Sequence, residues 1–426
     1  MRILRIPKSA RDFPAAWFIV CIALTAIGAT FVANCSSSPP PRVDMNALPV
    51  DGEDRIQAGE AVYLRYLGTG GVLIRWGDRT ILTAPYFSGH DTGELCITAT
   101  SCGFASQLVP NLDKIHRNAV PFTGNGAVAD DLPERLEQAE AIFVGHAHYD
   151  HLLDVPQIVR CYAPEARVYG STTAVDLLSE VAKDIRMRGR PACPKRNGAV
   201  DRPALGGASS GFSMSFGDVE RVSSGVVPPA NPRSEFEIRY RAVLFEHAPH
   251  VPLLRVDVLD FCREFLQVGY RRSPPKGVCD WAEGQTFAYF LDFLRGGELQ
   301  FRLYYNDAAG GKDFAQLPEG VRPGSIDLAI LTAASFALVD DYPGEFMRVA
   351  RPQAVFMNHW ENFLQFNQVR SARTRAMDPP PPVLFTDLQE FHDQVQAALP
   401  AVDPPQRNLL IPDIGAEFVL DINAGD

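Results

Sequence analysis

The stretch His146-Ala147-His148-Tyr149-Asp150-His151 is the strongest indication of fold and function in this chain. Three histidines and an aspartate fall within six positions, in a chain of 426 residues with nine histidines in all. An H-x-H-x-D-H pattern arises by chance in about one chain of this length in several thousand. In an extended loop His146 and His148 point the same way and can bind one metal ion, while Asp150 and His151 face a second.

The residues on either side of this run predict alternating strands and helices. Ala141-Ile142-Phe143-Val144 is a short apolar segment that ends at Gly145, which is typical of a strand buried on both faces. The histidine run therefore lies in the loop beyond a strand. Helical spacing over 155–162, a strand at 168–169 and a helix capped by Ser171 or Thr172 follow.

Other candidate ligands stand just past the ends of later predicted strands. These strands are 236–244, 299–305 and 354–357, with a further buried run at 326–331. Active sites of layered α/β folds gather at one edge, so we expect these ligands to complete the metal sites. His247, with His250 as the weaker alternative, closes the first site, Asp307 bridges the two metals and His359 completes the second.

The remaining pattern sets the limits of the folded domain. Ala61 to Thr83 predicts two or three short strands, with turns at 68–71 and 77–78. Thr386-Asp387-Leu388-Gln389 is a capping box that opens a last helix. The segment near 261–281 fits neither a helix nor a strand, and we expect an inserted loop there.

The N-terminal segment predicts export. Four basic residues between Arg2 and Arg11 precede an uncharged apolar run from Ala15 to Ala33, so residues 1–35 are a signal peptide, a lipoprotein signal or an anchor. Val32-Ala33-Asn34-Cys35 approximates a lipobox, although Asn34 replaces the usual small residue. Residues 36–60 are expected to be a flexible tether rich in Ser and Pro. We expect a lipoprotein of the cell envelope that faces the periplasm or exterior, with plain secretion or a single-span anchor as alternatives.

Charge and cysteine content agree with this placement. The formal net charge of −11 shows no clustered basic face, which excludes nucleic acid as the default partner. Setting aside Cys21 and Cys35 leaves six cysteines, an even number that suits an oxidising compartment. Six cysteines allow fifteen connectivities, and we expect the pairs that are close in sequence: Cys96 with Cys102, Cys161 with Cys193, and Cys262 with Cys279. The alternative is that several of these cysteines are small buried hydrophobes.

Together these residues resemble a known family. The H-x-H-x-D-H run, a later histidine before Ala248-Pro249, an aspartate in Tyr305-Asn306-Asp307-Ala308 and a strand-end histidine in His359-Trp360 resemble the metallo-β-lactamase-fold hydrolases. The resemblance covers the chain from about Ala61 to Leu420. The turn from Gly68 to Ile74, Tyr149 and Trp360 are most similar to the branch that contains the ascorbate-phosphate lactonases and the phospholipase D that releases N-acylethanolamines.

The resemblance implies an α/β fold, an αββα sandwich over residues 61–424. It implies one metal ion on His146, His148 and His247, and another on Asp150, His151 and His359, with Asp307 between them. His247 is preferred over His250 because it precedes Ala-Pro, much as the family's third histidine precedes Thr-Pro. Two positions depart from the family pattern. Ala84 stands before Pro85 where an aspartate is usual, and Thr69 stands where a histidine often follows the first glycine, so two groups that would support the metal-binding loop are missing.

The ligands predict the chemistry. Two divalent cations, zinc first and iron or manganese as alternatives, would hold a bridging water as hydroxide and polarise the oxygen under attack. Asp150 is the candidate catalytic residue, because it can take or return a proton. We interpret the nearby aromatic residues as core, with the lining of a pocket as the alternative. Glu361 and Asn362 are interpreted as residues that orient their loop, and the remaining histidines as surface or structural residues. The aromatic residues are Tyr149, Trp360 and Phe363, and the histidines are His90, His116 and His392.

Three functions remain open at this point. The first is hydrolysis of a phosphodiester, with a lipid as a substrate, since an anchored enzyme meets phospholipids and the apolar segment 261–270 would touch the bilayer. The second is hydrolysis of a lactone or another acyl bond by the same two metals. The third is a non-catalytic, metal-binding envelope lipoprotein. A Ser-His-Asp hydrolase is not favoured, because the chain has no G-x-S-x-G elbow. The oligomeric state is not predicted.

Overall fold

The computed structural model describes residues 52–90, 108–119, 132–188, 222–249, 275, 277, 280–310, 315–363, 382–383, 386–400 and 408–422. The predicted export segment 1–35, most of the predicted inserted loop and His250 lie outside this part of the chain. So do all the cysteines except Cys161, which is disulfide-bonded. Its pairing with Cys193 stays a prediction. Within the described residues, no helix has the length and apolar character needed to cross a bilayer.

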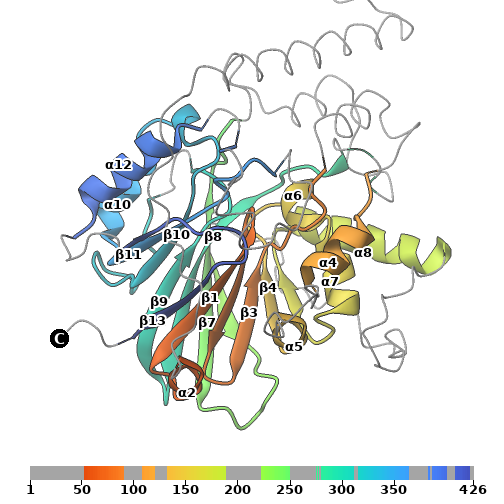
Figure 1. The fold of residues 1–426 in the computed structure, drawn as a ribbon, viewed down its shortest axis with the longest axis horizontal. Helices are drawn as coiled ribbons and strands as arrows, with labels where there is room; N and C mark the ends of the chain where they lie inside the picture. The colour runs from red at the N-terminus through yellow and green to blue at the C-terminus, as the bar shows by residue number, and fades with distance from the viewer. Residues whose placement is uncertain are drawn as a thin grey trace, which may run out of the picture.

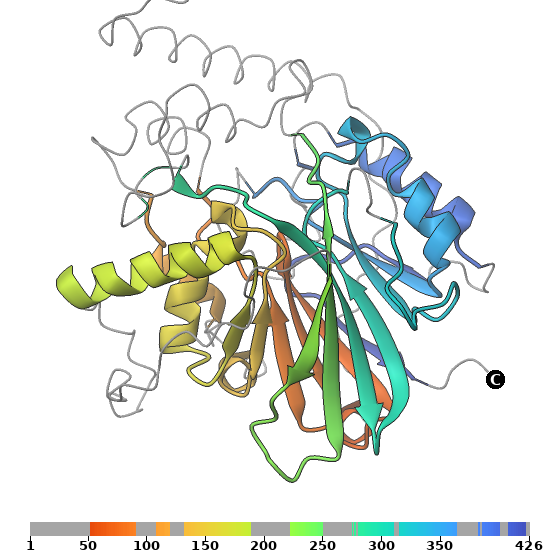
Figure 2. The same ribbon diagram turned by 180° about the vertical axis from the view of Figure 1, so that it is seen from behind.

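Two mixed β-sheets pack face to face, and helices lie on the outer side of each (Figures 1 and 2). The six-stranded sheet has the order β13 (Glu417–Asp421), β1 (Ala61–Gly68), β2 (Gly71–Trp76), β3 (Arg79–Thr83), β4 (Ala141–Phe143), β5 (Arg167–Tyr169). The seven-stranded sheet has the order β12 (Leu409–Leu410), β11 (Ala354–Asn358), β10 (Leu328–Thr332), β9 (Glu298–Tyr305), β8 (Thr286–Arg295), β7 (Phe236–Phe245), β6 (Val222–Val227). The predicted α/β class with two facing sheets is confirmed.

The helices divide between the two outer faces (Figure 1). Beside the six-stranded sheet lie α4 (Leu112–Ala119), α5 (Leu132–Glu137), α6 (Tyr149–Leu152), α7 (Val155–Cys161) and α8 (Thr172–Arg188). Beside the seven-stranded sheet lie α10 (Gly344–Ala350) and α12 (Leu388–Ala398), and a 3-10 turn, η2, spans Phe336–Leu338. Strands β1 to β4 are therefore buried on both faces, whereas β7 and β9 keep exposed residues such as Arg239 and Leu299.

Strand β1 shows how the sequence produces this double burial. Val62, Leu64 and Tyr66 pack in the core between the sheets. The alternate residues Tyr63 and Leu67 pack under the helices on the other side, because successive side chains of a strand point to opposite faces. All eight residues of β1 are consequently buried.

Several elements differ from the sequence-based expectation. Strand β8 was not predicted, because its near-continuous apolar run, TFAYFLDFLR, has no period that separates a buried strand from a buried helix. Helix α2 (Gly52–Gln57) lies inside the range 36–60 that was expected to be a tether. Ile56 is fully buried, and Arg75 donates to both carboxylate oxygens of Glu53 at 2.8 and 2.9 Å, so ordered structure begins by Gly52.

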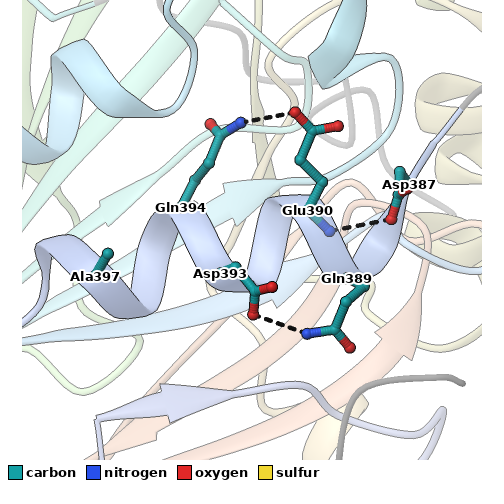
Figure 3. Close-up of a pocket in the computed structure, with 6 residues that line it drawn as sticks. All are labelled: Asp387, Gln389, Glu390, Asp393, Gln394 and Ala397. Carbon is teal, nitrogen blue, oxygen red and sulfur yellow. Dashed lines mark hydrogen bonds between the residues drawn. The ribbon is translucent and has the colours of Figure 1, made fainter. Parts of the chain in front are cut away.

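The last helix begins one residue later than the predicted capping box placed it. Asp387 is the N-cap residue of α12, and its Oδ1 accepts a hydrogen bond from the Glu390 amide at 3.0 Å (Figure 3). A hollow runs along the exposed side of this helix. Its lining side chains bond to one another, Gln389 to Asp393 at 2.7 Å and Gln394 to Glu390 at 3.3 Å. None of the predicted metal ligands lines this hollow.

Candidate metal centre

The structure brings all seven predicted ligands together where four strands end. His146 follows β4, His247 follows β7, Asp307 follows β9 and His359 follows β11. The side chains form three overlapping groups in which the candidate ligand atoms lie within 4.8 Å of one another. The first group is His146, His148 and His247; the second group is Asp150, His151 and His359; the third is His146, His151 and Asp307.

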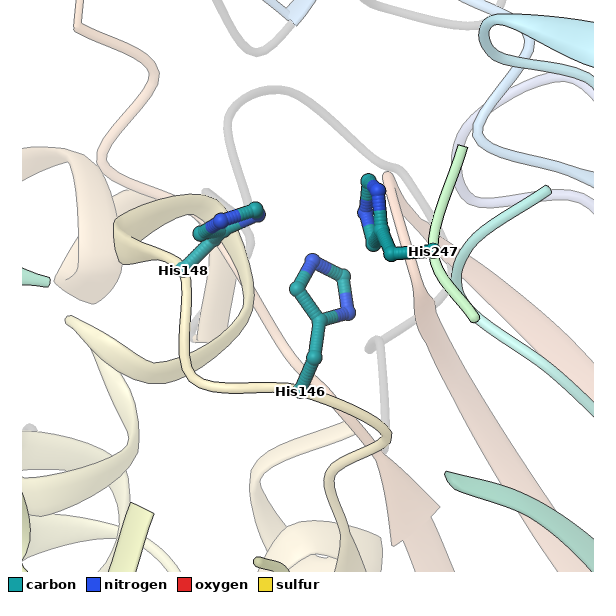
Figure 4. Close-up of side chains that lie close together, drawn as sticks. All are labelled: His146, His148 and His247. Atoms are coloured by element: carbon teal, nitrogen blue, oxygen red, sulfur yellow. The ribbon is translucent and has the colours of Figure 1, made fainter. Parts of the chain in front are cut away.

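The first group joins the two sheets. His146 and His148 come from the six-stranded sheet and His247 from the seven-stranded one, and their rings converge (Figure 4). The ring centroids of His146 and His148 are 4.5 Å apart, and that of His247 lies 4.7 and 5.1 Å from them. An isolated bridge to Gly310, together with an amide bond from Ala248 to the Ala309 carbonyl at 3.0 Å, fixes His247 beside the end of β9.

The second group depends on a helical turn that the sequence did not predict. The histidine run was expected to be extended, but Asp150 and His151 lie in α6 and His148 is its N-cap residue. Oδ2 of Asp150 lies 3.3 Å from Nε2 of His151 and 3.3 Å from Nε2 of His359. The turn moves the second half of the run away from the first, so that the two halves belong to different groups.

Asp307 connects the two groups. Its Oδ1 lies 2.9 Å from Nδ1 of His146, and its Oδ2 lies 3.3 Å from Nδ1 of His151. Oδ2 also accepts hydrogen bonds from the Gly145 amide at 2.8 Å and from the Tyr305 hydroxyl at 3.2 Å. A single carboxylate therefore touches one histidine from each group and also holds the start of the histidine loop.

The pKa shifts of His146 and Asp307 favour metal binding, whereas His151 holds a proton that a metal ion must displace, since the Asp150 and Asp307 carboxylates raise its pKa to about 10 against the effect of burial. Burial and the neighbouring His151 lower the pKa of His146, which favours the neutral ring that metals bind. Burial alone would raise the pKa of Asp307, but the positive charge of His151 and the hydrogen bonds from His146 and His151 hold it well below its usual range, so the carboxylate is ionised. Nδ1 of His359 is buried without a hydrogen-bond partner among the described residues. The other ring nitrogen, Nε2, faces the Asp150 carboxylate beside Nε2 of His151, and this convergence of imidazole and carboxylate atoms fits a metal centre.

The support that the missing acid at position 84 would provide comes from other residues. Ala84 is fully buried, and only its backbone takes part, its amide donating to the Phe143 carbonyl at 2.8 Å. The neighbouring Thr83 hydroxyl donates to the Gly70 carbonyl at 2.6 Å and accepts from the Val72 amide at 2.8 Å. The turn at 68–71 is thus held by Thr83, and Gly70 leaves no room for a side chain, since a Cβ there would lie 2.8 Å from Nδ1 of His151.

A buried aspartate that the sequence analysis did not single out anchors the loop after β3. Asp154 accepts hydrogen bonds from the amides of Phe87 and Ser88 at 2.6 and 2.7 Å and from the Ser88 hydroxyl at 2.5 Å. Burial raises the pKa of Asp154 to about 6, although these hydrogen bonds act in the opposite direction. The position of Asp154, three residues after His151, does not indicate this anchoring role, because the amides that it binds come from a distant loop.

We expect Asp154→Asn to change how stability depends on pH. A carboxyl group whose pKa rises from 3.8 to about 6 on folding stabilises the protein fully below pH 3.8, and loses that contribution as the pH rises through 6. Relative to the Asn variant, the wild type should therefore lose up to about 3 kcal/mol between pH 4 and 6. Urea unfolding of both proteins across that range measures the difference. Asp176→Asn, at an exposed site on α8, is the control, and parallel curves for wild type and Asp154→Asn would contradict the expectation.

The other residues named from the sequence do not belong to the three groups. His90 lies 2.9 Å from the Tyr86 hydroxyl and 3.0 Å from the Val109 carbonyl, and His392 pairs with Asp393 at 2.9 Å. Trp360 is fully buried and donates to the Pro412 carbonyl at 2.9 Å, as expected of a core residue. The ring of Phe363 lies 4.9 Å from that of His359, beside the second group.

Comparison with known proteins finds solved structures of low similarity and assigns no family to this chain. No protein-family model matches this chain, and no curated protein matches it in sequence. A metallo hydrolase from the hyperthermophilic archaeon Ignicoccus hospitalis is 12% identical, with a TM-score of 0.39 over 85% of this chain and 99% of that one. A protein from Thermotoga maritima described as a zinc-dependent hydrolase of the metallo-β-lactamase superfamily is 9% identical, with a TM-score of 0.28 over 78% and 84% of the two chains. A variant of the CmlA β-hydroxylase is 14% identical, with a TM-score of 0.37 over 85% of this chain and 54% of that one. Likeness at this level assigns neither a reaction nor a substrate.

Proposed function

We propose that this chain is a dinuclear, metal-dependent hydrolase of the metallo-β-lactamase superfamily. The observation that carries the proposal is the overlap of three groups of histidines and aspartates, all buried except the half-buried His247, where β4, β7, β9 and β11 end. The first group would hold one ion and the second group the other, with Asp307 between them. Imidazole and carboxylate ligands without cysteine suit zinc, and they suit iron and manganese as well.

Two divalent cations supply, when bound, a water of near-neutral pKa and a Lewis acid for a substrate oxygen. The chain's own residues hold these ions, orient the rings and exclude bulk solvent, since the exposed fraction of Asp150 is 6% and that of His151 is 1%. Asp150 is the residue to which we assign proton transfer to and from the reacting groups. Asp307 holds His146 and the loop at Gly145 in place through its two oxygens.

We propose a phosphodiester, with a membrane lipid as its source, as the substrate class. The proposal rests on the sequence of residues 1–35, whose basic start and apolar run predict export and a membrane anchor. An enzyme held at a bilayer meets phospholipid phosphodiesters at high local concentration. The lactone or acyl substrates considered from the sequence use the same metal chemistry, so the assay must include them.

The test is a metal analysis and a substrate panel on the purified chain. We expect two metal ions per chain and turnover of bis(p-nitrophenyl) phosphate that a chelator abolishes and added Zn²⁺ restores. Turnover of lactones alone would replace the phosphodiester proposal by the acyl one. Fewer than two metal ions per chain would contradict the two-metal site, and two bound metals without turnover on any substrate would favour a non-catalytic binding protein.

A further inference from the structure

Glu361 is a buried acid beside the second group that is not itself in any of the metal groups among the described residues. Its exposed fraction is 1%. Its Oε1 accepts a short hydrogen bond from the Thr69 amide, and its Oε2 accepts one from the Tyr66 hydroxyl at 2.5 Å. Both carboxylate oxygens are therefore committed to β1 and to the turn that follows it.

The same two residues hold the backbone of His359. The His359 amide donates to the Thr69 carbonyl at 2.9 Å and lies 3.0 Å from the Tyr66 hydroxyl oxygen, which accepts from it. The result is a closed ring of hydrogen bonds that runs from Glu361 through Thr69 and Tyr66 to His359. It joins the end of β11 in one sheet to the end of β1 in the other.

The backbone of His359 needs such support. Its φ angle is 51°, in the left-handed region that non-glycine residues rarely adopt. Residues held in this region persist only when their surroundings determine them, and they cluster at functional sites. The ring of hydrogen bonds is the surrounding structure that determines this conformation, and the conformation sets where the His359 side chain leaves the strand.

We propose that Glu361 is a positioning residue for the second metal site, which it serves through Tyr66, Thr69 and the backbone of His359. This inference rests on the proposed two-metal function. Thr69 contributes its backbone amide and carbonyl to the ring, and Glu361 is an acid that bonds directly to the turn at Thr69.

The test measures the two metal affinities separately. Wild type, Glu361→Ala, Glu361→Gln and Tyr66→Phe are titrated with Zn²⁺ against a chelator of known affinity, and each metal-free protein is unfolded in urea. Glu140→Gln is the matched control, because Glu140 is a buried acid that accepts from Arg79 at 2.5 Å and from the Ala230 amide at 2.6 Å, in none of the metal groups.

We expect Glu361→Ala to weaken the second Zn²⁺ by about 10- to 100-fold while the first keeps its affinity. Gln can still accept from the Thr69 amide, so Glu361→Gln should recover part of the loss, and Tyr66→Phe should show a partial loss. If Glu361→Ala does not fold, the second-site affinities of Glu361→Gln and Tyr66→Phe test the positioning role. Unchanged second-site affinity in the variants, or a loss matched by Glu140→Gln, overturns the positioning role. A wild type that binds fewer than two Zn²⁺ overturns the proposed function itself.

Discussion

The Asp307→Ala variant should bind neither metal ion, and its turnover should fall at least about 100-fold. Removal of a group that only orients metal ligands already lowers metal affinity or activity by about 10- to 100-fold. Asp307 is the one carboxylate among the described residues that contacts a histidine of each group, His146 at 2.9 Å and His151 at 3.3 Å. Its loss also frees the Gly145 amide. Metal content per chain and turnover of bis(p-nitrophenyl) phosphate measure the effect.

The control for this prediction is Asp292→Asn. Asp292 is a buried acid on β8 that bonds to Arg302 at 2.6 and 3.1 Å and pairs with Arg241, and it belongs to none of the metal groups. Its substitution should lower stability and leave the metal content unchanged. If Asp307→Ala keeps two metals, the bridging position assigned to Asp307 is wrong.

Gly145→Ala should have nearly as large an effect, because the added methyl group would crowd the Asp307 carboxylate. A Cβ at Gly145 would lie 2.6 Å from Cγ of Asp307, closer than any real contact of this kind. Asp307 cannot move aside, because both its oxygens are bonded to neighbours. We expect a loss of about 1–3 kcal/mol in the free energy of unfolding from overpacking, together with lost metal binding.

Gly170→Ala is the matched control for Gly145→Ala. Gly170 follows β5 as Gly145 follows β4, but the nearest atom to its Cβ would be Cβ of Ala174 at 3.1 Å. This substitution should cost less than about 1 kcal/mol and leave the metals in place. Equal effects of the two substitutions, measured by urea unfolding and metal analysis, would show that crowding of Asp307 is not the cause.

Much of the site could be predicted from local sequence. The strands before His146, His247, Asp307 and His359 have apolar patterns that are readable without a structure, and a polar residue directly after each strand marks the edge where sites form. The structure places all four side chains in its metal groups. Strand β8 was missed because burial on both faces removes the alternation on which strand prediction depends.

The sequence predicts that Glu361 orients its loop, but the partners of Glu361 and Asp154 could not be predicted, because they are distant in the chain. Asp154 bonds to Phe87 and Ser88, which lie 67 and 66 positions away, and Glu361 bonds to Thr69, 292 positions away. No periodicity or spacing connects such residues. The helical turn α6 was missed for a related reason, because a turn of four residues carries too little pattern to separate it from a loop.

The sequence by itself determined the ligand types, their order along the chain and the strands that carry them, because these follow from local hydrophobic pattern and from side-chain chemistry. Only the tertiary structure decided which residues hold the ligands, and that Asp150 and His151 lie on a helical turn. The packing of the two sheets brings the ends of β4, β7, β9 and β11 together, and hydrogen bonds across that junction set the positions of Asp307 and His359. Contacts between distant segments follow from global packing, which no local stretch of residues encodes.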